Sequence, residues 1–182
     1  MQEEATGVNI MDHTGSVTLI QNGKENILID VGGRGRLPEI QKGLAEKGLS
    51  EDKVDLIILT HFHLDHAFNI AAFPKARVIG WNHEWKEGST FRFKDIETWK
   101  VADGLAIVPT PGHTPEHISV LVLMDDGKKV MIAGDAINGK YVETKNVTAY
   151  SFDQNIYKQS AEKILSLSQE IHVGHGEIIR LG

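Results

Sequence analysis

The sequence predicts an α/β fold in which β-sheets are flanked by helices. The chain has 182 residues, which suits one domain with a sizeable core, and we expect a single domain over residues 1–182. Hydrophobic residues make up 41% and charged residues 24%, ordinary values for a globular protein. Strand and helix patterns follow one another in the order strand-rich, helix, strand, helix, strand-rich, helix, strand, which indicates sheets covered by helices.

The N-terminal half begins with a predicted hairpin followed by a helix. Val17–Ile20 and Asn26–Val31 have strand character, and Asn22-Gly23 between them favours a tight turn. Pro38 fits the first turn of an amphipathic helix, and Gly48 fits its end.

A buried strand and a second helix are expected next. Val54–Thr60 is a short continuous apolar run, the pattern of a strand buried on both faces. Ala67–Phe73 has helical character and stops at Pro74, and Ala76–Gly80 is another predicted strand. Asn82–Lys100 is polar and lacks clear periodicity, so we expect a long loop or an inserted segment, in which edge strands can form.

The C-terminal half continues with strands. Leu105–Pro109 is a predicted strand that leads into a turn-rich loop, and Ile118–Met124 with Lys129–Ala133 forms a predicted hairpin. Glu170–Val173 is the last short strand that the pattern indicates.

A helix is predicted between the hairpin and the last strand. Ser151 and Gln154 have the spacing of a capping box, which marks the N-terminus of a helix. The expected apolar face consists of Tyr157, Ala161, Ile164, Leu165 and Ser168.

Four of the predicted strands lead into residue types that bind metal ions. In chain order, these residues are His61, His113, Asp135 and His175. Strand ends on one edge of a sheet can converge in space, and loops at such an edge carry function on a rigid scaffold.

The spacing of the residues that follow His61 indicates which of them can hold the same cation. His61 and His63 lie two residues apart, so in extended chain they face the same way and can hold one cation, whereas Asp65 and His66 follow as the chain turns and can hold a second. The chain has no cysteine, so His, Asp or Glu must supply any ligands. A lone buried histidine is usually a core residue, and an aspartate at a strand end is usually a turn or cap residue. The presence of all four segments in one chain favours metal binding over these purely structural roles.

These segments resemble the motifs of the metallo-β-lactamase superfamily. The strings, in the family's order, are Thr60-His61-Phe62-His63-Leu64-Asp65-His66, Pro111-Gly112-His113-Thr114, Ala133-Gly134-Asp135 and Gly174-His175-Gly176. The resemblance runs from about Gly15 to the C-terminus. The compact form is most similar to the metallo-β-lactamase domain-containing protein 1 subgroup, and glyoxalase II is a more distant relative.

The resemblance implies a four-layer αβ/βα sandwich of two mixed β-sheets flanked by helices, with a dinuclear metal site at one edge. His61, His63 and His113 would hold the first metal, Asp65, His66 and His175 the second, and Asp135 would bridge both. A water or hydroxide between the cations would be the nucleophile, because metal binding lowers the pKa of water toward about 7.

Further residues receive supporting roles from the same resemblance. Asp65, beside the bridging water, would orient it or carry its proton, so Asp65 and Asp135 are the expected catalytic residues. Asp30, Thr60 and Thr114 are candidates for orienting the ligating imidazoles. Apart from the resemblance, His117 lies near His113 in the sequence and is a candidate for contacting substrate or supporting the ligands.

The predicted function is therefore a metal-dependent hydrolase that acts on a small ester, thioester, lactone, amide or phosphodiester. Zinc is the expected metal, and Fe²⁺ or Mn²⁺ suits the same ligands. One alternative is an iron-dependent oxidoreductase of the same fold, similar to persulfide dioxygenases, but these use a single iron, and the full second ligand set favours two metals. Another is a non-catalytic metal scaffold, but structural sites are normally closed by four ligands.

Charge and hydropathy limit the partners. A small-molecule substrate is expected, and the net charge of −6 does not favour a nucleic-acid partner, without excluding one. The acidic N-terminus has no apolar core like that of a signal peptide, and no apolar run approaches the roughly 20 residues that span a bilayer. We expect a cytoplasmic protein without a membrane partner. A homodimer is left open, and the Trp81–Trp99 segment could form a dimer contact or a substrate lid.

Overall fold

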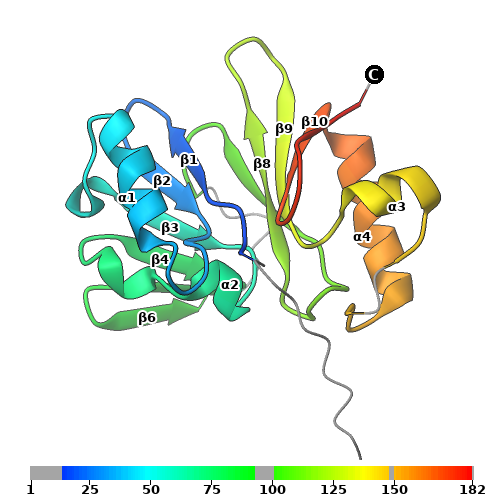
Figure 1. Cartoon of the computed structure of the whole chain (residues 1–182), viewed down its shortest axis with the longest axis horizontal. Helices are drawn as coiled ribbons and strands as arrows, with labels where there is room; N and C mark the ends of the chain where they lie inside the picture. Colours follow the sequence, from blue (N-terminus) through cyan, green and yellow to red (C-terminus); the bar gives the residue numbers. More distant parts are fainter. Residues whose placement is uncertain (1–13, 93–100, 148–149, 182) are drawn as a thin grey trace, which may run out of the picture.

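The computed structural model describes residues 14–92, 101–147 and 150–181, which form two facing β-sheets with helices on their outer sides (Figure 1). One sheet has six strands in the order β1-β2-β3-β4-β5-β6, and the other has five in the order β11-β10-β9-β8-β7. Both sheets mix parallel and antiparallel neighbours. The predicted sandwich of two mixed sheets is confirmed.

The six-stranded sheet comes from the N-terminal half of the chain. Its strands are β1 (Thr18–Gln21), β2 (Asn26–Ile29), β3 (Leu56–Leu59), β4 (Arg77–Gly80), β5 (His83–Lys86) and β6 (Ser89–Arg92). The β1–β2 hairpin is antiparallel, as predicted, and β2, β3 and β4 are parallel neighbours. The edge strands β5 and β6 occupy the segment for which a long loop or insertion was expected, and residues 93–100 of that segment, including Trp99, lie outside the described residues.

The five-stranded sheet comes from the C-terminal half. Its strands are β7 (Leu105–Pro109), β8 (Ile118–Leu123), β9 (Lys129–Gly134), β10 (Glu170–Val173) and β11 (Ile179–Arg180). β9 and β10 are parallel, so their C-terminal ends lie at the same edge of the sheet. The short strand β11 was not predicted.

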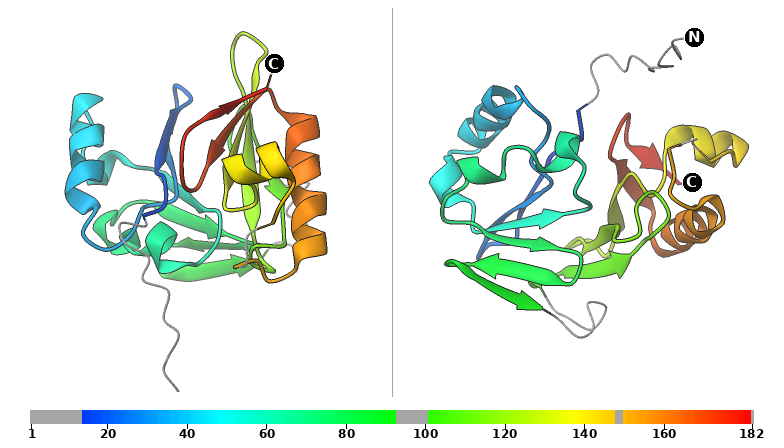
Figure 2. Two further views of the ribbon diagram at one scale, coloured as in Figure 1. Left: turned by 45° about the vertical axis from the view of Figure 1, so that its right-hand side comes forward. Right: turned by 90° about the horizontal axis from the view of Figure 1, so that it is seen from below.

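The helices cover the outer faces of the two sheets (Figures 1 and 2). The α-helices are α1 (Leu37–Glu46), α2 (Leu64–Ala67), α3 (Gly139–Thr144) and α4 (Gln154–Leu167), and 3₁₀ turns lie at η1 (Glu51–Lys53) and η2 (Ile70–Ala72). α1 lies outside the first sheet, and α3 and α4 lie outside the second. The helix α3 was not predicted.

The hydrophobic core lies in three layers because the central strands are buried on both faces. In β3, Leu56 and Ile58 pack between the sheets, whereas Ile57 and Leu59 pack beneath α1. β9 alternates in the same way, and its Met131 packs against α4. This alternation confirms the two-sided burial predicted for Val54–Thr60.

The predicted start of the helix after β3 was wrong. The helix after β3 begins at Leu64 rather than Ala67, because the His63 carbonyl accepts hydrogen bonds from both His66 N–H and Ala67 N–H at 3.0 Å. The expected helix over Ala67–Phe73 is reduced to the 3₁₀ turn η2. α2 is therefore short, and Asp65 and His66 lie in its single turn.

The cap of α4 is Asp153 rather than Ser151. The Asp153 carboxylate accepts hydrogen bonds from the backbone N–H groups of Asn155 and Ile156 at 2.8 and 3.0 Å. Its ionised oxygen also suits the positive end of the helix dipole.

No helix within residues 14–92, 101–147 and 150–181 has both the length and the apolar character that crossing a bilayer requires.

Candidate metal centre

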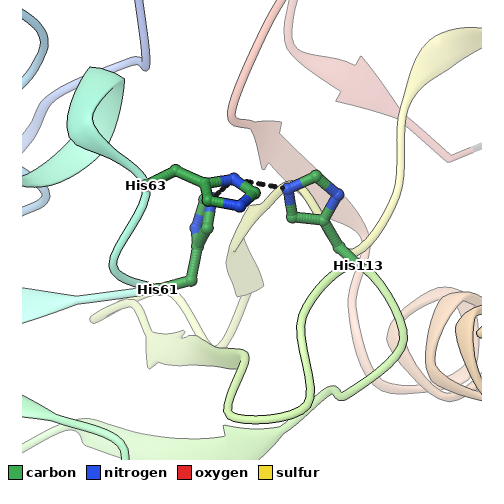
Figure 3. Close-up of side chains that lie close together, drawn as sticks. All are labelled: His61, His63 and His113. Carbon is green, nitrogen blue, oxygen red and sulfur yellow. Dashed lines mark hydrogen bonds between the residues drawn. The ribbon is translucent and has the colours of Figure 1, made fainter. Parts of the chain in front are cut away.

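Three histidines from two loops converge at one edge of the sandwich (Figure 3). His61 and His63 follow β3, and His113 lies in the loop after β7. The His63 Nδ1 atom lies 3.0 Å from His61 Nε2 and 3.0 Å from His113 Nε2. His61 and His113 are buried, whereas His63 is exposed. This first group therefore opens to solvent on the side of His63.

A second group of donors lies next to the first. Asp65 and His66 come from α2, and His175 follows β10. The His175 Nε2 atom lies 3.2 Å from Asp65 Oδ2 and 3.3 Å from His66 Nε2, and the last pair, His66 Nε2 and Asp65 Oδ2, is 3.7 Å apart. All three residues thus direct a nitrogen or oxygen into one small volume.

Asp135 joins the two groups. It follows β9, and its Oδ2 lies 3.3 Å from His113 Nε2 and 3.5 Å from His175 Nε2, while its Oδ1 lies 3.3 Å from His66 Nε2. The Oδ1 atom is buried and makes no hydrogen bond to any described residue. A buried carboxylate oxygen without such a partner is costly unless a cation satisfies it.

The donor spacing fits divalent cations. Four His or carboxylate ligands at about 2.0–2.2 Å from a tetrahedral ion lie about 3.3–3.6 Å from one another. The distances within the two groups run from 3.0 to 3.7 Å. Such contacts between imidazole nitrogens, with a shared carboxylate between the groups, match the ligand shell of an ion better than a hydrogen-bond network.

Asp30 orients two of the histidines. Its Oδ2 accepts a hydrogen bond from His66 Nδ1 at 2.7 Å and another from the Thr60 hydroxyl at 2.8 Å, and its Oδ1 accepts one from the Thr60 backbone N–H at 2.7 Å. The Thr60 oxygen also lies 3.0 Å from His61 Nδ1. Because the Nδ1 sides are engaged, the Nε2 atoms of His61 and His66 both face the centre. Asp30 holds a left-handed φ of 58°, a conformation uncommon for residues other than glycine.

His117 supports Asp135 through a hydrogen bond to its backbone. Its side chain is fully buried, its Nδ1 lies 2.9 Å from Thr110 Oγ1, and its Nε2 accepts a hydrogen bond from the Asp135 backbone N–H at 3.2 Å. Burial lowers the pKa of His117 to about 3, so the ring is neutral and can accept that bond. Of the two roles expected for His117, the burial favours support of the ligands over substrate contact. Sequence reasoning missed Thr110, which carries no motif signal.

Thr114 does not occupy the orienting position predicted for it. Its hydroxyl is buried, and it has no hydrogen-bond partner among the described residues. The Thr114 backbone carbonyl instead accepts a hydrogen bond from Gly112 N–H at 3.0 Å, which closes the tight turn that carries His113.

The electrostatics of the two groups differ. Burial lowers the pKa of His61 and of His113. Burial also opposes the charge on His66, but Asp135 and Asp30 outweigh it and raise the pKa of His66 to about 10. Without a cation, His66 is therefore protonated at neutral pH.

Pairing between imidazoles and carboxylates also shifts the pKa values of His175, Asp135 and Asp65. Burial by itself lowers the pKa of His175, but Asp135 and Asp65 raise it to about 9. Burial opposes the charge on Asp135, yet the imidazoles of His175 and His66 beside it hold the pKa of this carboxyl well below its usual range. The pKa of Asp65 is lowered chiefly by its hydrogen bond with His175. The metal-free centre thus balances its carboxylates with two protonated imidazoles, whose protons a cation must displace.

A glycine allows the close approach that the centre needs. A Cβ atom at Gly174 would lie 1.9 Å from Asp135 Oδ1. The Gly174 backbone N–H also bonds the Gly134 carbonyl at 2.7 Å, which holds the ends of β9 and β10 together. Only glycine fits at this crossing without moving the shared carboxylate.

Sequence comparisons place this chain among known proteins. The family model described as the metallo-beta-lactamase superfamily matches residues 11–105. The metallo-beta-lactamase domain-containing protein 1 of Xenopus laevis is 30% identical over 179 residues, which covers 96% of this chain and 76% of that protein. A probable metallo-hydrolase of Methanocaldococcus jannaschii is 31% identical over 160 residues, or 84% of this chain and 72% of its own length.

Solved structures share the fold. A metallo-beta-lactamase family protein from Thermus thermophilus superposes with a TM-score of 0.69 at 22% identity, covering 90% of this chain and 69% of its own. A dizinc quorum-quenching lactonase, in complex with its product N-hexanoyl-L-homoserine, superposes with a TM-score of 0.69 at 18% identity, covering 88% of this chain and 72% of its own. At these identities, the likeness is one of fold.

Proposed function

The chain belongs to the metallo-beta-lactamase superfamily and is a metal-dependent hydrolase of that family, and we propose that it works with two divalent cations held side by side. His61, His63 and His113 would hold the first cation. Asp65, His66 and His175 would hold the second, with Asp135 shared between them. The resemblance of the sequence to the metallo-beta-lactamase domain-containing protein 1 subgroup agrees with the relatives found.

One observation carries this proposal. The Asp135 carboxylate lies within 3.3 to 3.5 Å of a histidine from the first group and two from the second. A single carboxylate that reaches both groups supports two adjacent ions rather than one, because each group already supplies three donors of its own.

The chemistry needs the ions as well as the side chains around them. When bound, divalent cations lower the pKa of coordinated water and polarise a carbonyl or phosphoryl oxygen. Asp30 and Thr60 fix the tautomers and the orientation of His66 and His61. Asp65 is about one-third exposed, and its hydrogen bond with His175 lowers its pKa, so its carboxylate is ionised at neutral pH and would orient water or accept its proton.

The proposed reaction is hydrolysis of a small ester, thioester, lactone, amide or phosphodiester. Zinc is the proposed metal, because imidazole and carboxylate donors at this spacing suit it. The lactonase among the structural neighbours is described as a dizinc enzyme, which agrees with this choice.

Metal content provides the first test. Elemental analysis of the purified protein, after dialysis against zinc-containing and then metal-free buffer, should give about two zinc ions per chain. One tightly bound iron per chain would instead favour the oxidoreductase alternative.

Substitution of the shared carboxylate provides the second test. Asp135→Ala removes a donor from both groups, so it should lose metal and abolish hydrolysis of generic ester and phosphodiester probes. Asp125→Ala is the matched control, because Asp125 is exposed in the β8–β9 turn. Unchanged metal content and turnover in Asp135→Ala would show that the assignment is wrong.

Several expectations stay predictions. They are the single-domain organisation over residues 1–182, the cytoplasmic location, the preference for a small molecule over a nucleic-acid partner, which is not excluded, and the homodimer, which is left open.

A further inference from the structure

We propose that the metal centre acts on substrates with an apolar acyl chain next to the bond that is cleaved. The chain would lie between two apolar walls at the mouth of the centre. The first wall consists of Phe62, Leu64 and Phe68, and the second of Tyr150 and Phe152. This inference deepens the proposed function and rests on it.

The first wall is built on the loop and helix that carry the metal-binding groups. Leu64 is the residue between His63 and Asp65, and its side chain is 71% exposed. Phe68 lies four residues further, at the end of α2, and is 46% exposed. Side chains four residues apart lie on the same face of a helix, so the two form one apolar patch.

Phe62 extends this wall toward the first sheet. Its ring is 44% exposed and packs edge-to-face on Trp85, with 6.1 Å between the ring centroids. The close contact of the ring with Gly80 leaves no room for a Cβ atom there, so Phe62 is held in place.

The second wall is attached to the other loop of the centre. The Phe152 backbone N–H donates to the His113 carbonyl at 3.1 Å, and the Asp153 N–H donates to the Gly112 carbonyl at 3.0 Å. These two bonds fix the segment before α4 alongside His113. The Phe152 side chain is 69% exposed, and the Tyr150 side chain is 60% exposed.

The two walls are attached to histidines that lie next to each other at the open side of the centre. Leu64 adjoins His63, Phe152 is hydrogen-bonded to the backbone of His113, and the imidazoles of these two histidines are 3.0 Å apart. Figures 1 and 2 place α2 and the start of α4 at the same end of the sandwich. A substrate with its scissile group at the centre would therefore meet apolar side chains on both sides.

The degree of exposure marks these walls as a binding surface. Among the described residues, the three most exposed large apolar side chains are Leu64, Phe152 and Tyr150. Isolated exposed apolar residues are common, but apolar side chains gathered around a polar centre are typical of ligand sites.

An acyl chain fits these walls better than a nucleic acid. Four of the five wall side chains are aromatic and can stack on nucleobases, whereas Leu64, the most exposed of the five, is aliphatic and cannot. The net charge of −6 also opposes a polyanion.

The test is the dependence of hydrolysis on chain length. We expect kcat/KM of the zinc-loaded protein to rise from p-nitrophenyl acetate to the decanoate, by about fourfold for each methylene that the walls bury, the equivalent of ~0.8 kcal/mol. Leu64→Ser and Phe152→Ser should each reduce the ratio of decanoate to acetate kcat/KM by about tenfold.

Matched controls separate the walls from exposed apolar residues in general. Leu123→Ser on β8 and Phe91→Ser on β6 remove side chains that are 56% and 53% exposed and lie outside both walls. Both control variants should keep the chain-length dependence of the unaltered protein. An equal loss in the controls and in the wall variants would overturn the proposal.

Binding of unreactive ligands distinguishes this inference from the proposed function. We expect 2-decanone to perturb the NMR signals of both walls far more strongly than acetone does, and this difference to shrink in Leu64→Ser and Phe152→Ser. Binding of 2-decanone at the walls without ester hydrolysis would uphold the inference and contradict the proposed function. Ester hydrolysis that does not vary with chain length would contradict the inference and uphold the proposed function. Binding of a 12-residue oligouridylate at these walls, without binding of 2-decanone, would overturn the inference in favour of a nucleic acid.

Discussion

Asp30 is a sensitive point of the metal centre, although it is not among the proposed ligands. Its two carboxylate oxygens accept three hydrogen bonds, of which two, from His66 and from the Thr60 hydroxyl, end on Oδ2. Asp30→Asn keeps the shape of the side chain. It places an amide N–H₂ group where one of the two carboxylate oxygens stood. The Thr60 or His66 donors that had bonded this oxygen then face another hydrogen-bond donor.

The structure allows the size of this effect to be estimated. If the amide group replaces Oδ2, two buried donors lose their acceptor, and each costs about 1–3 kcal/mol, so the free energy of unfolding should fall by ~2–6 kcal/mol. Loss of a group that orients a ligating histidine typically weakens metal binding about 10- to 100-fold. The loss should affect mainly the second cation, because His66 belongs to the second group.

The assays are urea unfolding of the metal-free protein and competition for zinc with a chelator. Asp125→Asn, in an exposed turn, is the matched control and should change neither quantity. Two zinc sites of undiminished affinity in Asp30→Asn would refute the reasoning that Asp30 fixes His66.

Two further predictions follow from the same geometry. Gly174→Ala places a Cβ atom against Asp135 Oδ1, so we expect metal content to fall below one ion per chain, and two retained ions would contradict the close approach. The pKa values of His66 and His175, about 10 and 9 in the fold, lie above the ordinary value of about 6.5. Their contribution to the stability of the metal-free protein is therefore fully present below about pH 6.5 and is lost as the pH rises through about 9 to 10. Urea midpoints between pH 6 and pH 10.5, measured with EDTA, should fall across that window, and a midpoint that rises there would be inconsistent with the pairing. For the same reason, zinc affinity should increase with pH over this range.

The sequence by itself determined most of the strands and the order of the donors. Period and composition are local properties, so the β1–β2 hairpin and the buried strand β3 could be predicted from short windows. The residue types that follow β3, β7, β9 and β10 are equally visible in the chain, and parallel strands such as β9 and β10 must end at one edge.

Helix boundaries were predicted less well because they depend on individual hydrogen bonds. Ser151 and Asp153 both precede α4 and both can cap a helix, and only the tertiary position of the segment beside His113 selects Asp153. The early start of α2 likewise follows from the His63 carbonyl, and this start gives Asp65 and His66 their directions.

The tertiary structure alone decided how the donors are supported and what surrounds them. Asp30 and His66 are 36 residues apart in sequence, and only the packing of β2 beside β3 brings them within 2.7 Å. Burial, rather than sequence motif, assigned His117 to the support of Asp135. Local pattern specifies which atoms can bind a cation, whereas the position of each atom relative to the others is set by contacts between distant segments, and those exist only in the folded chain.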